Sequence, residues 1–191
     1  MPDTKLQFET IIKQCRDVFE KKLQDYGPSW RIMRPESITD QLLIKAKRIR
    51  NLEIKKISKI KEGIQPEFTG IVNYGIIGLI QLESGFSDAI DLTPQQALAL
   101  FDRFIADTQE LMEAKNHDYD EAWRLMRISS YTDLILTKLN RIKEIENKEG
   151  KVSFSEGIDA NYQDIINYAL FGLIKLTFES PNANIQEDET F

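Results

Sequence analysis

The sequence predicts an all-α protein in which two tandem three-helix units pack as a pseudo-twofold helical bundle. The first observation behind this fold class is an internal repeat: residues 8–55 align with residues 101–148 at a constant offset of 93, with 19 identities in 48 positions. The second is the spacing of apolar residues, which recurs at the helical period in each predicted element, while strand signals are weak. A repeat of this length that occurs twice indicates two paired units and not a solenoid.

The repeat continues into the last element of each unit. Residues 62–82 align with residues 156–176 at an offset of 94, with 10 identities in 21 positions, so a single-residue insertion separates the two alignments. Chance would give only a few matches, and the chain is therefore a tandem duplication. We predict unit one over residues 1–88, unit two over residues 89–180, and an acidic, frayed tail over residues 181–191.

The first helix of each unit is predicted from its apolar stripe and its start signal. In unit one the stripe includes Phe8, Ile11 and Cys15. In unit two the helix is expected to begin at Thr93 and Pro94, because threonine is a good capping residue and proline is favoured at the first helical position.

The second and third helices follow from the sequence in the same way. Residues 37–40 and 130–133 read Ser-x-x-Asp, which we interpret as capping boxes that begin the second helices. Residues 71–82 and 165–176 are apolar nearly all round, so we expect these third helices in the centre of the bundle. Residues 84–88 form the linker between the units.

Composition excludes several functional classes. The 191 residues include 31 acidic and 25 basic side chains, a net charge of −6 that argues against general nucleic-acid binding. One cysteine (Cys15) and one histidine (His117) exclude an internal disulfide and a Cys/His zinc site. The longest apolar run, residues 76–80, is too short for a membrane span, and the N-terminal residues lack a signal-peptide pattern, so we expect a cytoplasmic protein. Any metal must be held mainly by carboxylates and amides, which favours Mg²⁺, Mn²⁺ or Ca²⁺.

The densest identity lies between the first and second helices. Residues 22–34 and 115–127 share a lysine, an aspartate, a tyrosine, a tryptophan, a methionine and two arginines at matched positions. Aromatic planes beside guanidinium groups suit a nucleobase or an anion. The alternative is structural, with tryptophan and methionine filling the end of the bundle while aspartate and arginine pair across the loop. In unit two the candidate nucleotide contacts are Lys115, Asp118, Tyr119, Trp123, Arg124 and Arg127.

The second helices carry two further candidates in unit two, Lys138 and Arg141. Lys138 falls inside the apolar stripe, as Lys45 does in unit one, and Arg141 flanks it. A lysine in such a place either extends to the edge of the core or pairs with an acid. The functional alternative is contact with a phosphate group.

Two pairs of oxygen-bearing side chains in unit two are the candidate metal ligands. Glu110 and Glu113 lie three residues apart on the first helix, and Asp164 and Asn167 lie three residues apart on the third, so each pair shares a helix face. Oxygen ligands on rigid elements suit Mg²⁺ bound to phosphate. The alternatives are a water-facing Glu110 and an Asp164 that only favours the helix start. Because a buried, unpaired carboxylate is costly, Asp164 should have a metal, a lysine or an arginine as its partner.

At these motifs the sequence resembles a known family. Residues 22–27 read Lys-x-x-Asp-Tyr-Gly, residues 138–142 read Lys-x-x-Arg-Ile, and residues 164–168 read Asp-x-x-Asn-Tyr. These segments resemble the nucleotide modification associated domain, an all-α family of otherwise unknown function. The layout is also similar, more distantly, to the MazG-like all-α nucleoside triphosphate pyrophosphatases, which bind Mg²⁺ through acidic pairs on neighbouring helices. Unit one departs from the family pattern at Gly70 and unit two at Asp120, so we expect one competent site and one decayed site.

The sequence therefore predicts a protein that handles nucleotides. It is either a Mg²⁺-dependent nucleoside triphosphate pyrophosphohydrolase or a domain that binds a nucleotide without turnover. The alternative is a non-catalytic structural or partner-binding helical module. The expected partner is a nucleotide or another phosphorylated small molecule, with no membrane, and association into a homo-oligomer stays open.

Overall fold

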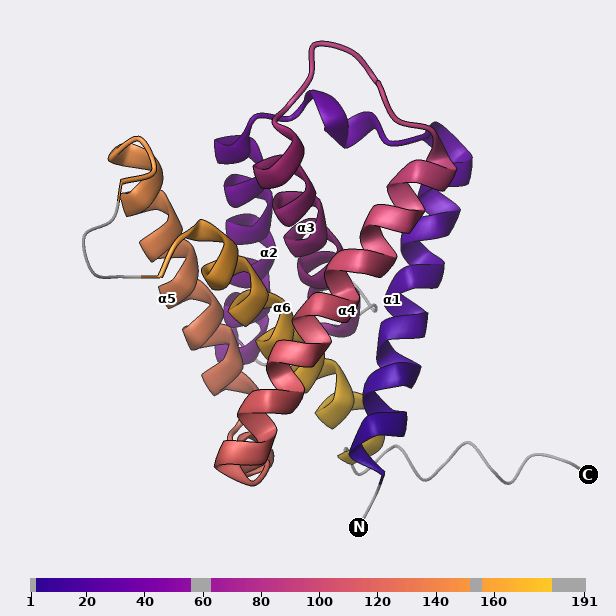
Figure 1. Ribbon diagram of the computed structural model, residues 1–191. Helices are drawn as coiled ribbons and strands as arrows, with labels where there is room; N and C mark the ends of the chain where they lie inside the picture. Colours follow the sequence, from indigo (N-terminus) through magenta and orange to yellow (C-terminus); the bar gives the residue numbers. More distant parts are fainter. Residues whose placement is uncertain (1–2, 56–62, 152–155, 180–191) are drawn as a thin grey trace, which may run out of the picture.

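A computed structural model describes residues 3–55, 63–151 and 156–179 (Figure 1). These residues form helices, turns and loops, with no strand among them, so the predicted all-α class is confirmed. Two short 3-10 turns, η1 (Ser29–Ile32) and η2 (Ala122–Leu125), join the first helix of each unit to the second, and a π-helical turn, η3 (Lys175–Glu179), follows the last helix. The α-helices are α1 (Thr4–Tyr26), α2 (Pro35–Lys55), α3 (Gln65–Ser84), α4 (Pro94–Tyr119), α5 (Ile128–Asn147) and α6 (Ile158–Ile174).

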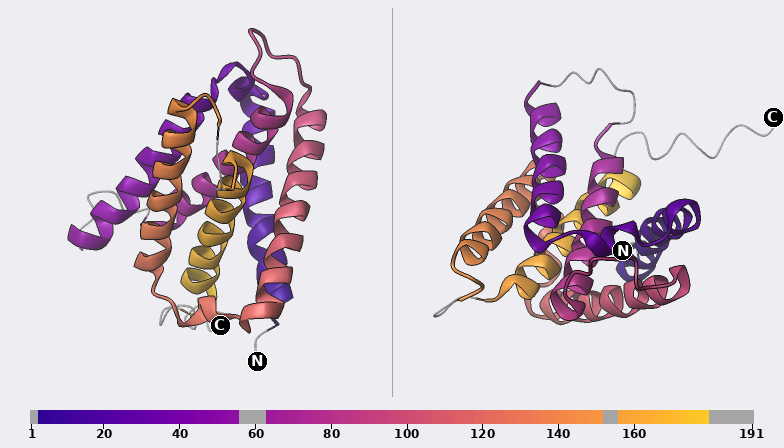
Figure 2. Two further views of the ribbon diagram at one scale, coloured as in Figure 1. Left: turned by 60° about the vertical axis from the view of Figure 1, so that its left-hand side comes forward. Right: turned by 90° about the horizontal axis from the view of Figure 1, so that it is seen from above.

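Each helix packs against its counterpart from the other repeat. α3 and α6 form the central pair, with the α1–α4 pair on one side and the α2–α5 pair on the other (Figures 1 and 2). Contacts between unlike helices are matched as well, because α1 touches α6 and α4 touches α3. An approximate twofold axis between the repeats produces this pattern, so the predicted pseudo-twofold bundle is confirmed. The unit boundaries stay predictions, and the predicted frayed tail lies outside the described residues.

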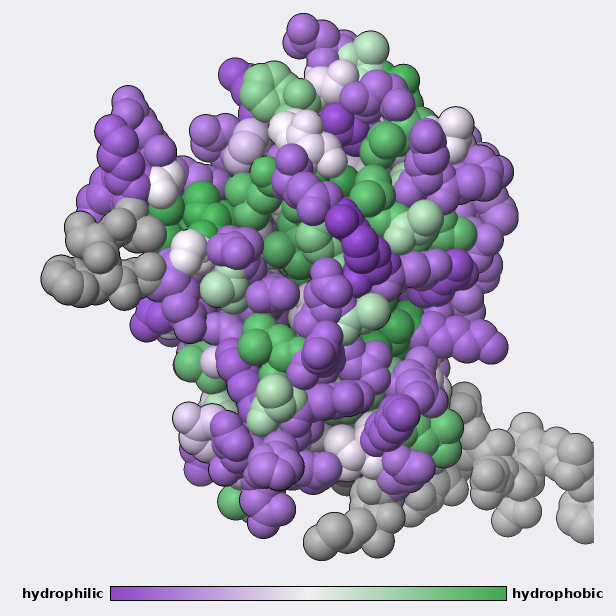
Figure 3. All heavy atoms as spheres, in the orientation of Figure 1, coloured by the Kyte–Doolittle hydropathy of each residue, from purple (hydrophilic) through white to green (hydrophobic). Residues whose placement is uncertain are grey.

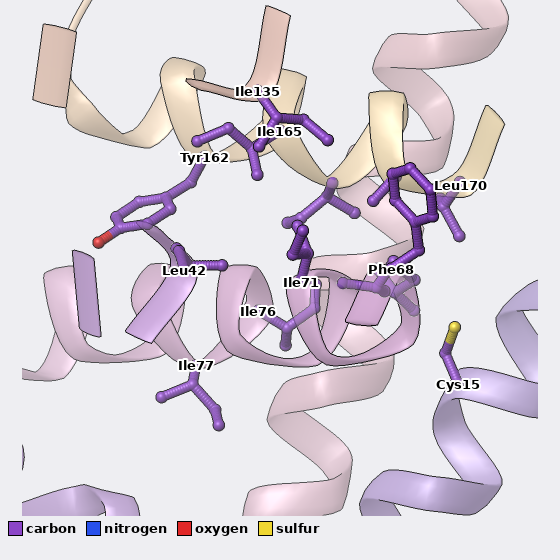
Figure 4. Packing of buried hydrophobic residues seen from close by; sticks show 14 of the residues in the cluster. Cys15, Leu42, Phe68, Ile71, Ile76, Ile77, Ile135, Tyr162, Ile165 and Leu170 are labelled. Carbon is purple, nitrogen blue, oxygen red and sulfur yellow. The ribbon is translucent and has the colours of Figure 1, made fainter. Parts of the chain in front are cut away.

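The central helices are almost wholly buried, as the sequence predicted. They approach closely because each has a glycine at the crossing: a Cβ on Gly78 would lie 2.7 Å from the ring of Tyr162, and a Cβ on Gly172 would lie 3.1 Å from the ring of Phe68. The two contacts are equivalent, because Gly172 is the repeat counterpart of Gly78 and Phe68 is the repeat counterpart of Tyr162. Figure 4 shows side chains of α6, Ile165 among them, directed toward those of α3. The apolar core therefore continues from one unit into the other.

The start signal predicted for the second unit is confirmed, and those predicted for the second helices are wrong. The side chain of Thr93 accepts a hydrogen bond from the backbone of Gln96, whose own side chain bonds back, which is a complete capping box. In contrast, α2 and α5 each begin two residues before the predicted capping serines, Ser37 and Ser130, which therefore lie in the first helical turn.

The aspartates of those predicted boxes serve the interface between α2 and α5 instead. Asp40 accepts a hydrogen bond from Lys143 at 3.1 Å, and Asp133 pairs with Arg50 at 3.8 Å. The two pairs are repeat counterparts, so each unit contributes the same acid and an equivalent base. Both are exposed ion pairs, which contribute little to stability.

The face of the molecule drawn in Figure 3 is mainly hydrophilic, with smaller hydrophobic patches between the helices. The described helices include none that is both long and apolar enough to cross a membrane.

Candidate functional site

Each unit forms a pocket between the end of its first helix, its connecting turn and its third helix. We call them the half-one pocket, of about 330 Å³, and the half-two pocket, of about 480 Å³. Every residue that lines the half-two pocket is the repeat counterpart of a residue that lines the half-one pocket. The half-two lining residues are Met112, Lys115, Asn116, Tyr119, Ala122, Trp123, Met126, Asp164, Asn167, Tyr168 and Phe171. The duplication has therefore preserved one pocket in two copies.

Asp164 lies between two lysines in the half-two pocket. Its Oδ1 accepts a hydrogen bond from Nζ of Lys115 at 2.7 Å, and its Oδ2 accepts one from Nζ of Lys138 at 2.5 Å. The lysines come from α4 and α5, so three helices meet at one carboxylate. Asp164 is only 7% exposed. Burial raises the pKa of its carboxyl, but the two lysine hydrogen bonds outweigh burial and hold the pKa below the ordinary value, so the group is a carboxylate at neutral pH.

The half-one pocket has Gly70 in place of this aspartate, and its two lysines are arranged differently. Lys45 pairs with Glu67, one helical turn earlier on α3, at 3.7 Å, while Glu67 has a closer partner in Arg48. A Cβ on Gly70 would lie 2.9 Å from Cε and 3.0 Å from Nζ of Lys45, so this lysine lies directly over the glycine. Lys22 forms no ion pair or hydrogen bond with any side chain or carbonyl in the described part of the chain.

Both pockets contain a buried asparagine with an unused acceptor. The side-chain amide of Asn73 donates to the carbonyl of Cys15 at 3.1 Å, and that of Asn167 donates to the carbonyl of Thr108 at 3.5 Å. A carbonyl only accepts, so the amide nitrogen must face it and the amide oxygen must point elsewhere. Within the described residues neither Oδ1 has a partner, although the side chains are only 6% and 4% exposed. An unsatisfied buried acceptor costs about 1–3 kcal/mol, and a ligand N–H or O–H would remove that cost.

Some aromatic rings of the half-two pocket are covered by other side chains, and others are free to contact a ligand. The ring of Trp123 stacks on Phe171 at 4.5 Å and 7°, and the guanidinium of Arg124 lies 4.3 Å from the ring centroid. Two groups this close to a parallel ring system lie on opposite faces, so only the edge of Trp123 reaches the pocket. This arrangement favours the structural interpretation of the tryptophan as a plug. The aromatic rings left to contact a ligand are Tyr119, which is 71% exposed, and the half-buried Tyr168.

The sequence segments that build both pockets also decide the family. Residues 22–82 and residues 115–176 each match the model of the nucleotide modification associated domain 1 family, and together they cover more than half of the chain. The protein belongs to this family. Each matched segment begins at a pocket lysine, Lys22 or Lys115, and runs to the third helix, so the predicted tandem duplication is confirmed. No curated protein and no solved structure matches the chain, and nothing in these comparisons supports the resemblance to MazG-like pyrophosphatases.

Several of the predicted nucleotide contacts lie at the pocket of the second family repeat. Lys115, Tyr119 and Trp123 line it directly. Lys138 reaches it through its bond to Asp164. Arg141 is exposed on α5, one turn from Lys138.

The remaining predicted contacts lie outside this pocket. Arg124 donates to Gln7 and Thr4 of α1, at 2.7 and 2.8 Å, and also pairs with Glu121 and Glu179, so it joins the connecting turn to the first helix. Asp118 is exposed beside His117, and Arg127 is exposed at the start of α5. The structure brings neither Asp118 nor Arg127 together with the pocket residues.

The predicted metal ligands are not gathered around one point. Glu110 and Glu113 are exposed on α4, and Glu113 accepts a hydrogen bond from Gln109 at 3.1 Å. Asp164 and Asn167 are buried on α6, where both carboxylate oxygens of Asp164 are bonded to lysines. Across the described ranges, no three His, Cys, Asp or Glu side chains cluster closely enough to hold a metal ion. A Mg²⁺ site stays a prediction.

One supporting feature of the family pocket went unpredicted. Gln81 of α3 donates to the carbonyl of Met33 at 2.9 Å, and its counterpart Lys175 donates to the carbonyl of Met126 at 2.6 Å. Different side chains thus hold the same connecting turn against the third helix. The available signal was a polar residue, glutamine or lysine, at a matched position near the end of two largely apolar segments.

Proposed function

We propose that this protein binds a nucleotide, without turning it over, in its duplicated pocket. The observation that carries the proposal is the pair of buried asparagines, Asn73 and Asn167, each of which lines a pocket and has an amide oxygen without a donor. Two repeats that have diverged at most positions keep the same amide, the same bond to the first helix and the same unused acceptor. A buried acceptor that is unused and lines the pocket in both repeats is available to a donor on a ligand.

The chemistry around the asparagines suits a nucleotide. An amide oxygen can accept a hydrogen bond from an N–H of a base, and neighbouring tyrosines, Tyr119 and Tyr168 in half two, offer aromatic surface for the ring. In half one, Lys22 lines the pocket without a described acidic partner and supplies a cationic group that a phosphate could meet. Volumes of about 330 and 480 Å³ fall within the range typical of small-molecule sites. The family name is in keeping with this class of ligand.

We propose binding rather than hydrolysis because of the acids at the pocket. A Mg²⁺-assisted hydrolase needs several oxygen ligands around the phosphate, in addition to a route for activated water. Among the described lining residues of the half-two pocket Asp164 is the sole carboxylate, and two lysines already engage it. The half-one lining, as described, contains no carboxylate.

Calorimetric titration with a panel of nucleotides, with and without Mg²⁺, tests the proposal. Wild type should bind at least one nucleotide, and the double variant Asn73→Leu with Asn167→Leu should bind it about tenfold more weakly, because the base loses its acceptor. Folding should be affected little, since the lost amide bonds are offset by removal of two unsatisfied oxygens.

Asn161 provides a matched control. It is a third buried asparagine with an unpartnered Oδ1, but it lines neither described pocket and its amide holds the start of α6. Asn161→Leu should leave nucleotide affinity unchanged. If no nucleotide binds wild type at millimolar concentration, the protein is better described as a structural or partner-binding module. Release of phosphate or pyrophosphate during the titration would restore the hydrolytic interpretation.

A further inference from the structure

The two pockets share their lining but differ in charge at one position. In half two the carboxylate of Asp164 occupies the space between the ammonium groups of Lys115 and Lys138. In half one the matching residue is Gly70, which has no side chain, and the flexible end of Lys45 lies over it. The half-two aspartate therefore shows what kind of group two lysines at this position bind: an anion with two oxygens directed at them.

The lysines of half one have little to neutralise them. Lys22 is the sole charged residue among the described lining of the half-one pocket, and it pairs with no described acid. Lys45 is 3.7 Å from Glu67, but that carboxylate is bound more closely by Arg48. Lys22 faces the pocket, Lys45 lies over Gly70 at its wall, and the one described acid nearby, Glu67, is shared with Arg48, so a net positive charge is left that attracts an anion from solution.

The rest of the half-one pocket suits a ligand larger than an ion. Asn73 brings its unpartnered amide oxygen, and Tyr74 lies with its ring 5.7 Å from Nζ of Lys45. Trp30 and Tyr26 form other parts of the wall. An anion bound by the two lysines would thus lie next to an aromatic and hydrogen-bonding surface in a single pocket.

We propose that the half-one pocket binds the phosphate group of a phosphorylated ligand with Lys22 and Lys45, at the position of the Asp164 carboxylate in half two, once the flexible end of Lys45 moves off Gly70. In half two the two lysines are balanced by two acids, Asp164 and Glu156, the latter 3.8 Å from Nζ of Lys138, so this pocket takes only an uncharged ligand, such as a nucleoside. A nucleotide as the ligand rests on the proposed function; the phosphate position itself does not. The unit whose sequence lacks the family aspartate is then the one that recognises phosphate.

The chain carries a separate reporter for each pocket. It has two tryptophans, and Trp30 lines the half-one pocket while Trp123 lines the half-two pocket. Trp123→Phe leaves a protein in which fluorescence reports half one, and Trp30→Phe leaves one that reports half two. Each is titrated with inorganic phosphate, with a nucleoside and with its 5′-monophosphate, and calorimetry of the same titrations detects binding that does not change fluorescence.

Phosphate should change the emission of Trp30 and leave that of Trp123 unaltered. The monophosphate should bind half one about tenfold more tightly than the nucleoside does, because charge-assisted hydrogen bonds to two lysines are added. Gly70→Asp recreates the half-two arrangement and should abolish the phosphate response. The substitution is sterically feasible, since the atoms that a new Cβ would meet are the flexible end of Lys45. Gly70→Ala adds the Cβ without the charge and should retain the response.

A reciprocal variant keeps the proposal testable if Gly70→Asp fails to fold. Asp164→Asn preserves shape, removes the charge between Lys115 and Lys138, and should give half two a phosphate response that wild type lacks. The inference is overturned if phosphate neither changes the fluorescence of Trp30 nor gives a binding signal in calorimetry. It is also overturned if Gly70→Asp binds phosphate as wild type does, or if the two pockets respond to phosphate equally. Nucleoside binding without a preference for phosphate would overturn the inference and leave the proposed function standing. A phosphate response in half one with no nucleoside or nucleotide binding would leave the inference standing and overturn the proposed function.

Discussion

Asp164 shows how one side chain sets the properties of a pocket. It is buried between Lys115 and Lys138, with its pKa held below the ordinary value by their hydrogen bonds against the opposing effect of burial. Asp164→Asn should destabilise the protein by about 3 kcal/mol at neutral pH, because removing one member of a buried pair leaves uncompensated charge. Urea unfolding at constant ionic strength measures the change.

The pH dependence of that loss has a definite sign. A carboxyl with a lowered folded pKa binds its proton less tightly when folded, so its contribution is present above the unfolded pKa and disappears as pH falls through the folded value. The difference between wild type and Asp164→Asn should therefore shrink under acid conditions. Asp159, an exposed acid in the first turn of the same helix, is the matched control, and Asp159→Asn should cost only about 0.3–1 kcal/mol. Equal losses for both variants would mean that Asp164 merely favours the helix start.

Trp123 and Tyr119 line the same pocket but have different roles, since one packs in the core and the other is available to a ligand. Trp123 is covered on both faces and 6% exposed, whereas Tyr119 is 71% exposed. Trp123→Ala should cost about 3–5 kcal/mol of unfolding free energy, as large-to-small core changes do. Tyr119→Ala should change stability by no more than about 0.5 kcal/mol and act on ligand affinity instead. A Trp123→Ala variant as stable as Tyr119→Ala would contradict the plug interpretation.

The role of Arg124 illustrates what the sequence could not reveal at this scale. Its match with Arg31 in unit one made it a candidate nucleotide contact. Its partners, however, are Thr4 and Gln7 at one end of the chain and Glu179 near the other. No local pattern tells which residues distant in sequence will meet a polar loop, so a phosphate contact and a structural contact looked the same.

At the scale of elements, the α2–α5 interface holds a pair of half-buried glutamates. Glu146 accepts a hydrogen bond from Thr39 at 2.6 Å, and Glu53 accepts one from Thr132 at 2.9 Å. Burial raises the pKa of both carboxyls; the threonine hydrogen bonds lower it, and nearby acids raise it further, so the net pKa lies above the ordinary value. A raised carboxyl pKa means that folding favours the protonated form, so stability falls as pH rises from the ordinary glutamate range through the raised pKa.

Neutralising these glutamates should therefore stabilise the interface at pH 7. Glutamine keeps an oxygen that accepts from threonine and removes the charge, so Glu53→Gln and Glu146→Gln should each raise the unfolding free energy by up to about 1 kcal/mol. The gain should vanish at acid pH, where the wild-type glutamates are protonated. Glu144→Gln, on an exposed site of α5, should show no comparable gain. Thermal unfolding across a pH series gives the comparison. Destabilisation by both substitutions would show that the negative charges of Glu53 and Glu146 stabilise the interface.

The sequence predicted the helices well and some of their ends badly. Apolar spacing and the matched repeat gave all six α-helices and the central place of α3 and α6, because burial of an apolar face dominates those choices. The Ser-x-x-Asp segments at 37–40 and 130–133 were misjudged because a capping pattern inside a helix looks the same as one at its start. The interface contacts of their aspartates come from the opposing helix and not from the local sequence.

The sequence predicted which residues form the pockets but not how their charges are arranged in space. Identity between residues 22–34 and 115–127 located the connecting turns, and the Gly70 difference was visible from the alignment. The sequence suggested that losing the aspartate meant losing the site. Only the spatial arrangement shows that Lys45 lies over Gly70 and that the lining is otherwise preserved.

At the scale of the whole molecule, the two units depend on one another. α6 is apolar nearly all round and is buried against α3 of the other unit as well as against α5 of its own, and the α2–α5 contacts also cross between units. A separated unit would leave the inner faces of α5 and α6 in water. The loss of so much apolar burial should prevent residues 89–180 from folding alone as a monomer.

The pseudo-twofold contacts supply a partner for such a fragment, which leads to the last prediction. In a homodimer of residues 89–180, Gly172 of one copy would face Tyr162 of the other, as Gly78 faces Tyr162 in the intact chain. Asp133 would likewise face Lys143 of the second copy, the same type of pair as Asp40 with Lys143. The isolated fragment should therefore be helical only as a dimer, with a concentration-dependent melting temperature. Sedimentation and circular dichroism over a dilution series measure both properties. Gly172→Leu, which blocks the close helix crossing, should leave the fragment monomeric and largely unfolded, whereas a helical wild-type fragment that stays monomeric would show that each unit has a sufficient core of its own.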